Sequence, residues 1–188
     1  MARRGTVAVS DAEPSVRRAY FECRYGQLHV HNAMPAGGGF DEATPLLCIH
    51  RSGTTGRMFT GLMRLVGRDR SVYAPDLPGC GESDGPPTQA TSSELAAALA
   101  DFLRDLRLRR VDLLAAGTGA FVAAELALAQ VDAVRRVAFL DPLDASSGRD
   151  ARERLPLLTQ PTLLLHAPDD LDAQLQPVIS ELRTFLSA

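Results

Sequence analysis

The chain has no lysine, and all 20 of its basic residues are arginines. The arginines are scattered along the 188 residues, which fits the codon bias of a GC-rich genome better than a basic binding surface. Acidic residues slightly outnumber them, and the formal net charge is −3. Binding to nucleic acid depends on concentrated positive charge. We therefore expect no nucleic-acid partner.

Cysteine is scarce, and long apolar runs are absent. The three cysteines, Cys23, Cys48 and Cys80, are widely spaced without a C-x-x-C motif, which favours reduced thiols and a cytoplasmic location over a disulfide framework. The first residues are basic but lack the apolar region of a secretory signal. Hydrophobic residues at 45% and charged residues at 23% are ordinary for a globular protein, so we expect no membrane insertion.

The length suits one domain with a full core. We expect residues 1–17 to be flexible and residues 18–188 to form a single domain. Within that domain, short apolar runs alternate with segments of helical period, and residues 18–30 resemble a hairpin turning at Tyr25-Gly26. Such alternation predicts an α/β fold with a mostly parallel, doubly wound sheet and helices on both faces. The strands are expected at residues 45–50, 70–75, 111–115, 134–140 and 161–166, and helices at 58–65, from Ser92 or Ser93 to 106, at 120–127 and at 178–186.

The stretch Val111–Leu126 predicts a buried strand that turns abruptly into a helix. The apolar run before the turn gives way to Gly117-Thr118-Gly119, a connection rich in residues that tolerate strained backbone. A tight turn of this kind holds a nucleophile or binds an anion at a helix N-terminus. No serine, cysteine or aspartate stands at its apex, where the chain has Gly117.

Sites in parallel sheets lie at the carboxyl ends of the strands. Four loops of this chain meet that condition: residues 50–55, 76–83, 117–119 and 166–170. We expect them to converge in space although they are far apart in sequence.

The order and spacing of these loops resemble the α/β-hydrolase superfamily, over about residues 18 to 170. His50-Arg51-Ser52-Gly53 is similar to the family's oxyanion loop, and residues 76–83, DLPGCGES, match its D-x-P-G-x-G-x-S loop. Ala115-Ala116-Gly117-Thr118-Gly119 stands where the nucleophile elbow G-x-S-x-G belongs, and residues 161–170 resemble the strand that presents the triad acid. The resemblance implies an oxyanion and substrate-binding site formed by two loops, with the Ser52 and Thr118 amides as the oxyanion donors. Its residues are His50, Arg51, Ser52, Gly117 and Thr118. The resemblance also implies an acid at Asp170.

Two members of the catalytic triad are missing from this pattern. Glycine replaces the serine, and Thr118 follows one residue late, either as a displaced nucleophile or as a helix-capping threonine. The segment after Asp170, where the family carries its base, has no histidine. His166, at the end of the last expected strand, either reaches the site or packs elsewhere. Thr118, Asp170 and His166 are the catalytic candidates that remain.

The other two histidines, His29 and His31, share one face of the early hairpin by period-two alternation. We expect them on the surface, and no second motif supports a metal site or a cofactor. The short segment between Asp141 and Pro161 leaves no room for a cap domain. The last strand of the sheet is hard to locate, so the sheet either ends in an exposed edge or is completed by a partner subunit in a homo-oligomer.

Three functions stay open at this point. The first is a hydrolase of a small ester, lactone or related carbonyl compound. The second is a protein that kept the fold, lost the chemistry and binds a small molecule or serves in an assembly. The third takes Ala115-x-Gly117-x-x-Ala120, with Asp141 after the next strand, as an approximate dinucleotide fingerprint. Its first glycine is replaced by Ala115.

Overall fold

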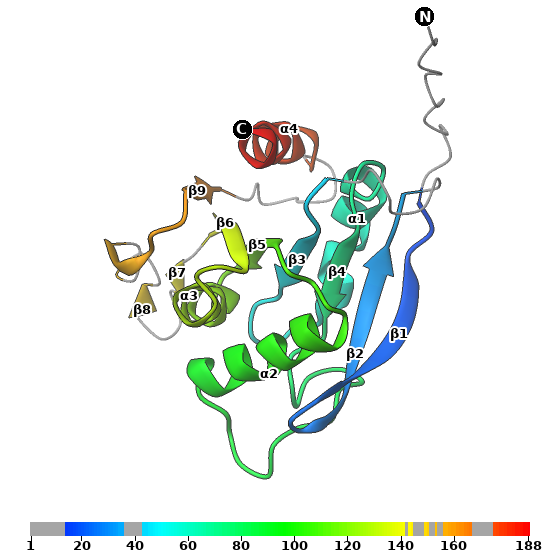
Figure 1. The fold of residues 1–188 in the computed structure, drawn as a ribbon, viewed down its shortest axis with the longest axis vertical. Helices are drawn as coiled ribbons and strands as arrows, with labels where there is room; N and C mark the ends of the chain where they lie inside the picture. The colour runs from blue at the N-terminus through cyan, green and yellow to red at the C-terminus, as the bar shows by residue number, and fades with distance from the viewer. Residues whose placement is uncertain are drawn as a thin grey trace, which may run out of the picture.

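The computed structural model describes residues 14–35, 43–141, 143–144, 149–150, 153, 156–166 and 175–188. The expected domain boundary at residue 17 therefore adjoins the undescribed segment 1–13. The described residues form one seven-stranded sheet between two layers of helices (Figure 1). This is the α/β architecture that the sequence pattern predicts.

The strands run in the spatial order β1-β2-β4-β3-β5-β6-β9. The β1 and β2 strands form an antiparallel hairpin, and β2 also pairs antiparallel with β4. The remaining neighbours pair in parallel. The strand bounds are β1 Arg17–Cys23, β2 Gly26–Ala33, β3 Leu46–Ile49, β4 Val72–Pro75, β5 Val111–Ala116, β6 Val134–Leu140 and β9 Thr162–Leu165.

Helices cover both faces of the sheet. One face packs against α2 and α3, and the other packs against α1 and α4, which gives two separate hydrophobic clusters (Figure 1). Because the central strands are buried on both faces, they are apolar without alternation, as in other parallel sheets. The helices span η1 Gly56–Phe59, α1 Thr60–Val66, α2 Ser92–Asp105, α3 Gly119–Ala129 and α4 Leu175–Ser187.

The N-terminus of α2 corrects one expectation. Thr91, rather than Ser92 or Ser93, caps the helix through a complete capping box with Glu94. The Thr91 hydroxyl accepts from the Glu94 N–H, and the Glu94 carboxylate accepts from the Thr91 N–H at 2.8 Å. Two serines follow the cap directly, so composition alone did not identify the capping residue.

A buried ion-pair cluster closes the amino end of the sheet. Asp112 of β5 is fully buried and accepts two hydrogen bonds from the Arg135 guanidinium, at 2.9 and 2.7 Å. Arg70 approaches the same carboxylate at 3.5 Å, and Arg135 also donates to the Leu186 carbonyl in α4. The carboxylate is therefore fully paired, as burial demands. The ion pairs at the amino end have a structural role. A functional site is expected at the carboxyl end of the sheet.

The segment after β6 is short, as expected. Its described part holds a small antiparallel ladder of β7 Leu143–Asp144 and β8 Arg149–Asp150, and shows no cap domain there. In the described sheet β9 pairs only with β6, so it forms an edge, and self-association through that edge stays a prediction.

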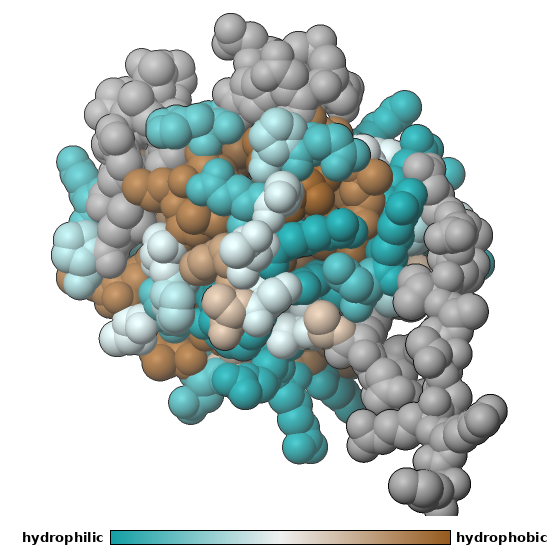
Figure 2. Space-filling view, turned by 90° about the horizontal axis from the view of Figure 1, so that it is seen from above, coloured by the Kyte–Doolittle hydropathy of each residue, from teal (hydrophilic) through white to brown (hydrophobic). Residues whose placement is uncertain are grey.

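On the face viewed in Figure 2, apolar side chains lie between polar ones. In the described part of the chain, no helix has the length and hydrophobicity to cross a membrane.

Candidate active site and histidine cluster

The turn between β5 and α3 has the backbone of a nucleophile elbow. Gly117 has φ +49°, a left-handed conformation that favours glycine, and Thr118 already has helical dihedrals. The Gly117 N–H donates to the Leu140 carbonyl at 2.9 Å, and its carbonyl accepts from the Ala120 N–H. The turn is thus fixed to β6 on one side and to its own helix on the other.

Gly119 explains why the helix can begin so close to the sheet. A Cβ at this position would lie 2.5 Å from the His50 carbonyl oxygen and 2.7 Å from that of Ile49. Both distances are below any tolerated contact, so only glycine lets α3 approach β3 in this way. The last glycine of the elbow motif is therefore retained for a packing reason.

The apex itself carries no reactive group. A Cβ at Gly117 would lie 3.0 Å from Cβ of Arg51, and the Arg51 Cδ and Cγ would follow at 3.6 and 3.9 Å. The aliphatic part of Arg51 thus lies over the position from which the family's serine projects. The elbow has kept its geometry without its nucleophile.

Thr118 makes a contact that neither sequence interpretation anticipated. Its side chain forms no capping hydrogen bond with α3, so the helix-capping interpretation is wrong. Instead, Oγ1 accepts a hydrogen bond from the Ser52 N–H at 2.6 Å. One of the two amides expected to bind an oxyanion is therefore occupied by a hydroxyl of the protein.

His50 holds the oxyanion loop rather than a substrate. It is fully buried, and its Nε2 accepts from the Leu77 N–H at 2.8 Å. Its Nδ1 therefore carries the proton and donates to the Arg51 carbonyl at 2.9 Å. Burial lowers the pKa of His50, which favours the same neutral form. Both ring nitrogens are used, so His50 joins the loop after β3 to the loop after β4.

The carboxyl edge continues from the elbow through β6 to β9. Gly117 is bonded to Leu140, and the Asp141 N–H donates to the Leu165 carbonyl at 3.0 Å. Asp141 has φ +46°, and its Oδ1 lies 3.6 Å from Nδ1 of His166. The His166 side chain is 92% exposed, so it is not packed in the core. Asp170, the expected acid, lies outside the described residues.

The expectation for His29 and His31 is partly wrong. The two rings do share a face, with centroids 4.8 Å apart, but both residues are buried rather than on the surface. The reason is that β2 pairs with β4 as well as with β1, so β2 is an interior strand of the sheet. His31 lies opposite Ala74, and the Asp76 N–H donates to the His29 carbonyl.

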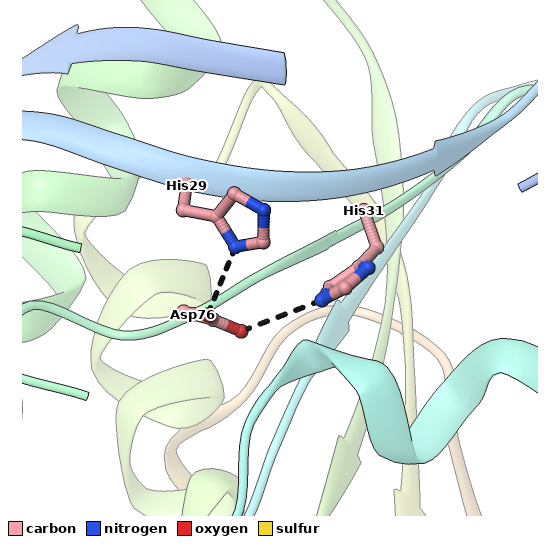
Figure 3. Close-up of side chains that lie close together, drawn as sticks. All are labelled: His29, His31 and Asp76. Atoms are coloured by element: carbon pink, nitrogen blue, oxygen red, sulfur yellow. Dashed lines mark hydrogen bonds and ion pairs between the residues drawn. The ribbon is translucent and has the colours of Figure 1, made fainter. Parts of the chain in front are cut away.

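This register brings Asp76 to the two rings (Figure 3). His29 Nδ1 donates to Asp76 Oδ2 at 2.9 Å, and His31 Nε2 lies 3.9 Å from Oδ1. The carboxylate also accepts from the N–H groups of Gly56 at 2.8 Å and Glu82 at 3.1 Å. Burial alone would raise the pKa of Asp76, but these hydrogen bonds outweigh it and lower the pKa below its ordinary value.

Sequence reasoning missed this cluster, although both parts of its signal were present. The two histidines alternate on one strand, and Asp76 opens the D-x-P-G-x-G-x-S loop. Only the pairing of β2 with β4 joins them, and local patterns do not specify that pairing. We refer below to His29, His31 and Asp76 as the histidine cluster.

Comparison with known proteins agrees with the fold. The profile described as the alpha/beta hydrolase family matches residues 46–187, which is more than half of the chain. The protein therefore belongs to the alpha/beta hydrolase family. No curated protein gives a significant match.

Solved structures give the same fold. Cfl2 from Burkholderia cenocepacia superposes with a TM-score of 0.62 at 27% identity, covering 70% of this chain and 45% of that one. Carboxylesterase CesB from Bacillus subtilis gives 0.61 at 20% identity, with 70% and 45% covered. Epoxide hydrolase VrEH1 from Vigna radiata gives 0.59 at 20% identity, with 66% and 39% covered. The matched part of this chain thus spans less than half the length of each of these relatives.

Proposed function

We propose that the protein hydrolyses a small ester, lactone or related carbonyl compound with water as the nucleophile, and forms no covalent intermediate at the elbow. The observation that carries this proposal is the row formed by Gly117, Asp141 and His166 along one edge of the sheet. The elbow offers a helix N-terminus, and the neighbouring strands offer an imidazole beside a carboxylate.

The elbow supplies the binding part of this chemistry. The positive end of the α3 dipole favours a carbonyl oxygen that gains negative charge. The Thr118 N–H is one donor, and the Ser52 N–H becomes the second when the Thr118 hydroxyl rotates away from it.

His166 supplies the base. An imidazole can act as a general base toward water, and a carboxylate nearby orients the ring and stabilises its charged form. Asp141, at 3.6 Å, is in that position. Asp170 stays the alternative partner on the sequence pattern alone.

A second candidate function is favoured by the contact between Ser52 and Thr118. A hydrogen bond of 2.6 Å that occupies an oxyanion donor suits a protein that binds a small molecule without converting it. In this alternative, the elbow is a binding site for a carbonyl or carboxylate group, and His166 has no catalytic role.

Hydrolysis of p-nitrophenyl butyrate separates the two functions. We expect turnover above the buffer rate, and a decrease of about a hundredfold in kcat/KM for His166→Ala, because general-base catalysis contributes at least that much. Asp141→Asn should lower kcat/KM in the same direction, and Asp132→Asn, at an exposed carboxylate away from this edge, is the matched control. Equal rates for His166→Ala and the unaltered protein would overturn the proposal.

A fluorophosphonate probe tests the absence of a covalent step. We expect no labelled residue in the unaltered protein. Labelling that disappears in Thr118→Val would make Thr118 the nucleophile and contradict the proposal. If the protein shows no turnover but small carboxylates raise its unfolding temperature, the binding function is supported instead.

A further inference from the structure

We infer that the histidine cluster is a binding site for Zn²⁺. His29, His31 and Asp76 are all buried, and each offers one ligand atom within 4.8 Å of the others. Two imidazoles and one carboxylate are a donor set for zinc or a related first-row transition metal, whereas Mg²⁺ and Ca²⁺ prefer oxygen ligands alone. This site is independent of the function proposed for the elbow.

The distances are compatible with coordination after small shifts. Ligand atoms around a tetrahedral zinc lie about 3.3 Å apart, given metal–ligand bonds of about 2.0 Å. The distance from His29 Nδ1 to Asp76 Oδ2 is 2.9 Å, and that from His31 Nε2 to Oδ1 is 3.9 Å. To bind zinc, the distance from His29 to Asp76 must lengthen and the distance from His31 to Asp76 must shorten (Figure 3). Three protein ligands leave a fourth position for water.

An unpartnered nitrogen supports the same site. His29 Nδ1 lies 2.9 Å from the Asp76 carboxylate, so the other ring nitrogen, Nε2, points away from this partner. Nε2 is buried, and it has no hydrogen-bond partner among the described residues. Burial of such a group is unfavourable. Zinc on Nδ1 would place the ring proton on Nε2 and make this nitrogen a donor.

An acceptor for that proton is already in place. Glu82 Oε2 lies 4.0 Å from His29 Nε2, and histidines bound to metals usually donate their other N–H to a carboxylate. The Tyr20 hydroxyl donates to the same Glu82 oxygen at 2.7 Å, and Arg18 approaches Oε1 at 3.4 Å. These contacts hold the Glu82 carboxylate beside the ring.

The carboxylate ligand is oriented from the other side. The N–H groups of Gly56 and Glu82 fix the two oxygens of Asp76. His31 Nε2 faces the same carboxylate at 3.9 Å. The cluster thus has ligands that are already oriented toward one another.

Zinc titration of the chain tests the inference. The protein is purified without a histidine tag and stripped with a chelator, and Zn²⁺ is titrated in competition with a chromogenic chelator. We expect one Zn²⁺ per chain and a higher unfolding temperature with metal. His31→Gln should weaken binding at least about a hundredfold. Glu82→Gln should weaken it about tenfold, because the amide is a poorer acceptor for the N–H of His29. Co²⁺ in place of zinc should give the visible bands of nitrogen and oxygen ligation, without a thiolate band.

Matched variants separate this site from other ligands on the chain. His166→Gln removes an exposed histidine and should leave the affinity unchanged, as should Cys23→Ser combined with Cys80→Ser. The inference is overturned if no stoichiometric binding occurs, or if His31→Gln and Glu82→Gln both bind like the unaltered chain. Circular dichroism checks that His31→Gln folds, and the exposed position of Glu82 keeps the second variant informative in any case.

Discussion

The elbow and the histidine cluster differ in what each has kept. The elbow has the backbone of a catalytic turn, with Gly117 in the left-handed region and Gly119 against β3, but it has no nucleophile. The histidine cluster has three reactive side chains at close range but belongs to no catalytic motif of the sequence. Shape and chemistry are therefore separable in one chain.

The reason lies in what holds each region. Gly119 is required because α3 packs on β3, whatever stands at residue 117, so the turn survives the loss of its serine. Asp76 is held by backbone N–H groups of its own loops, and its meeting with the histidines follows from strand pairing. Packing maintains the elbow, whereas hydrogen bonds and strand pairing maintain the histidine cluster. Neither region needs the other to keep its geometry.

The largest effect is expected from Asp76→Ala. The substitution leaves the buried Gly56 N–H, the partly buried Glu82 N–H and His29 Nδ1 without their acceptor, and it should lower the free energy of unfolding by about 3 kcal/mol. Urea unfolding in the presence of a chelator measures this. Asp105→Ala, on the exposed surface of α2, should change the value by less than about 0.5 kcal/mol. Similar losses for the two variants would show that the cluster is not a stabilising network.

A smaller loss is expected from Gly119→Ala. The added methyl group would clash with two backbone carbonyls of β3, so α3 must move, at a cost of about 2 kcal/mol. Gly53→Ala is the matched control, since its Cβ would meet nothing and only the positive φ of +74° costs energy, about 1 kcal/mol. If both variants lose the same free energy of unfolding, backbone strain rather than close packing explains the glycine at residue 119.

The smallest effect is expected from pH. Burial lowers the pKa of His50 and of His31, so the unfolded chain binds these protons at a higher pH than the folded chain does. The contribution of these two histidines to the free energy of unfolding should be fully present above the unfolded pKa of about 6.5. It should decrease as the pH falls below that value.

Urea unfolding at pH 7.5 and pH 5.5, with chelator present, tests this. His31→Gln should weaken the dependence on pH, because one of the two groups is gone. Greater stability at the lower pH would contradict the assignment of a buried neutral His50.

Much of the fold could be predicted because its signals are local. Apolar runs identified the central strands, and Gly117-Thr118-Gly119 identified the turn. The cap of α2 was misassigned by one or two residues, because Thr91, Ser92 and Ser93 all have suitable hydroxyls. The first residue of a helix depends on which hydroxyl faces the free N–H groups of its first turn, and composition does not determine that.

The candidate site was less predictable because its contacts are not local. His50 was expected in the oxyanion loop, but its bond to Leu77 links two loops. Thr118 was expected to cap a helix or to act as a nucleophile. Its hydroxyl binds the Ser52 amide, so the capping interpretation is wrong, and the nucleophile stays a prediction. The burial of His29 and His31 depends on a partner strand more than forty residues away in the sequence. The role of Asp170 stays a prediction.

Asp76 and Leu77 are consecutive residues, and this adjacency joins the two regions. Asp76 faces the histidine cluster, and the Leu77 N–H is bound by His50, next to Arg51 and the elbow loop. Thermodynamic linkage makes such a connection reciprocal. If zinc shifts this loop toward one position, a ligand at the elbow that prefers the same position gains affinity, and it must raise the affinity for zinc by the same factor. Through this one peptide bond, a ligand at either region can change the affinity of the other.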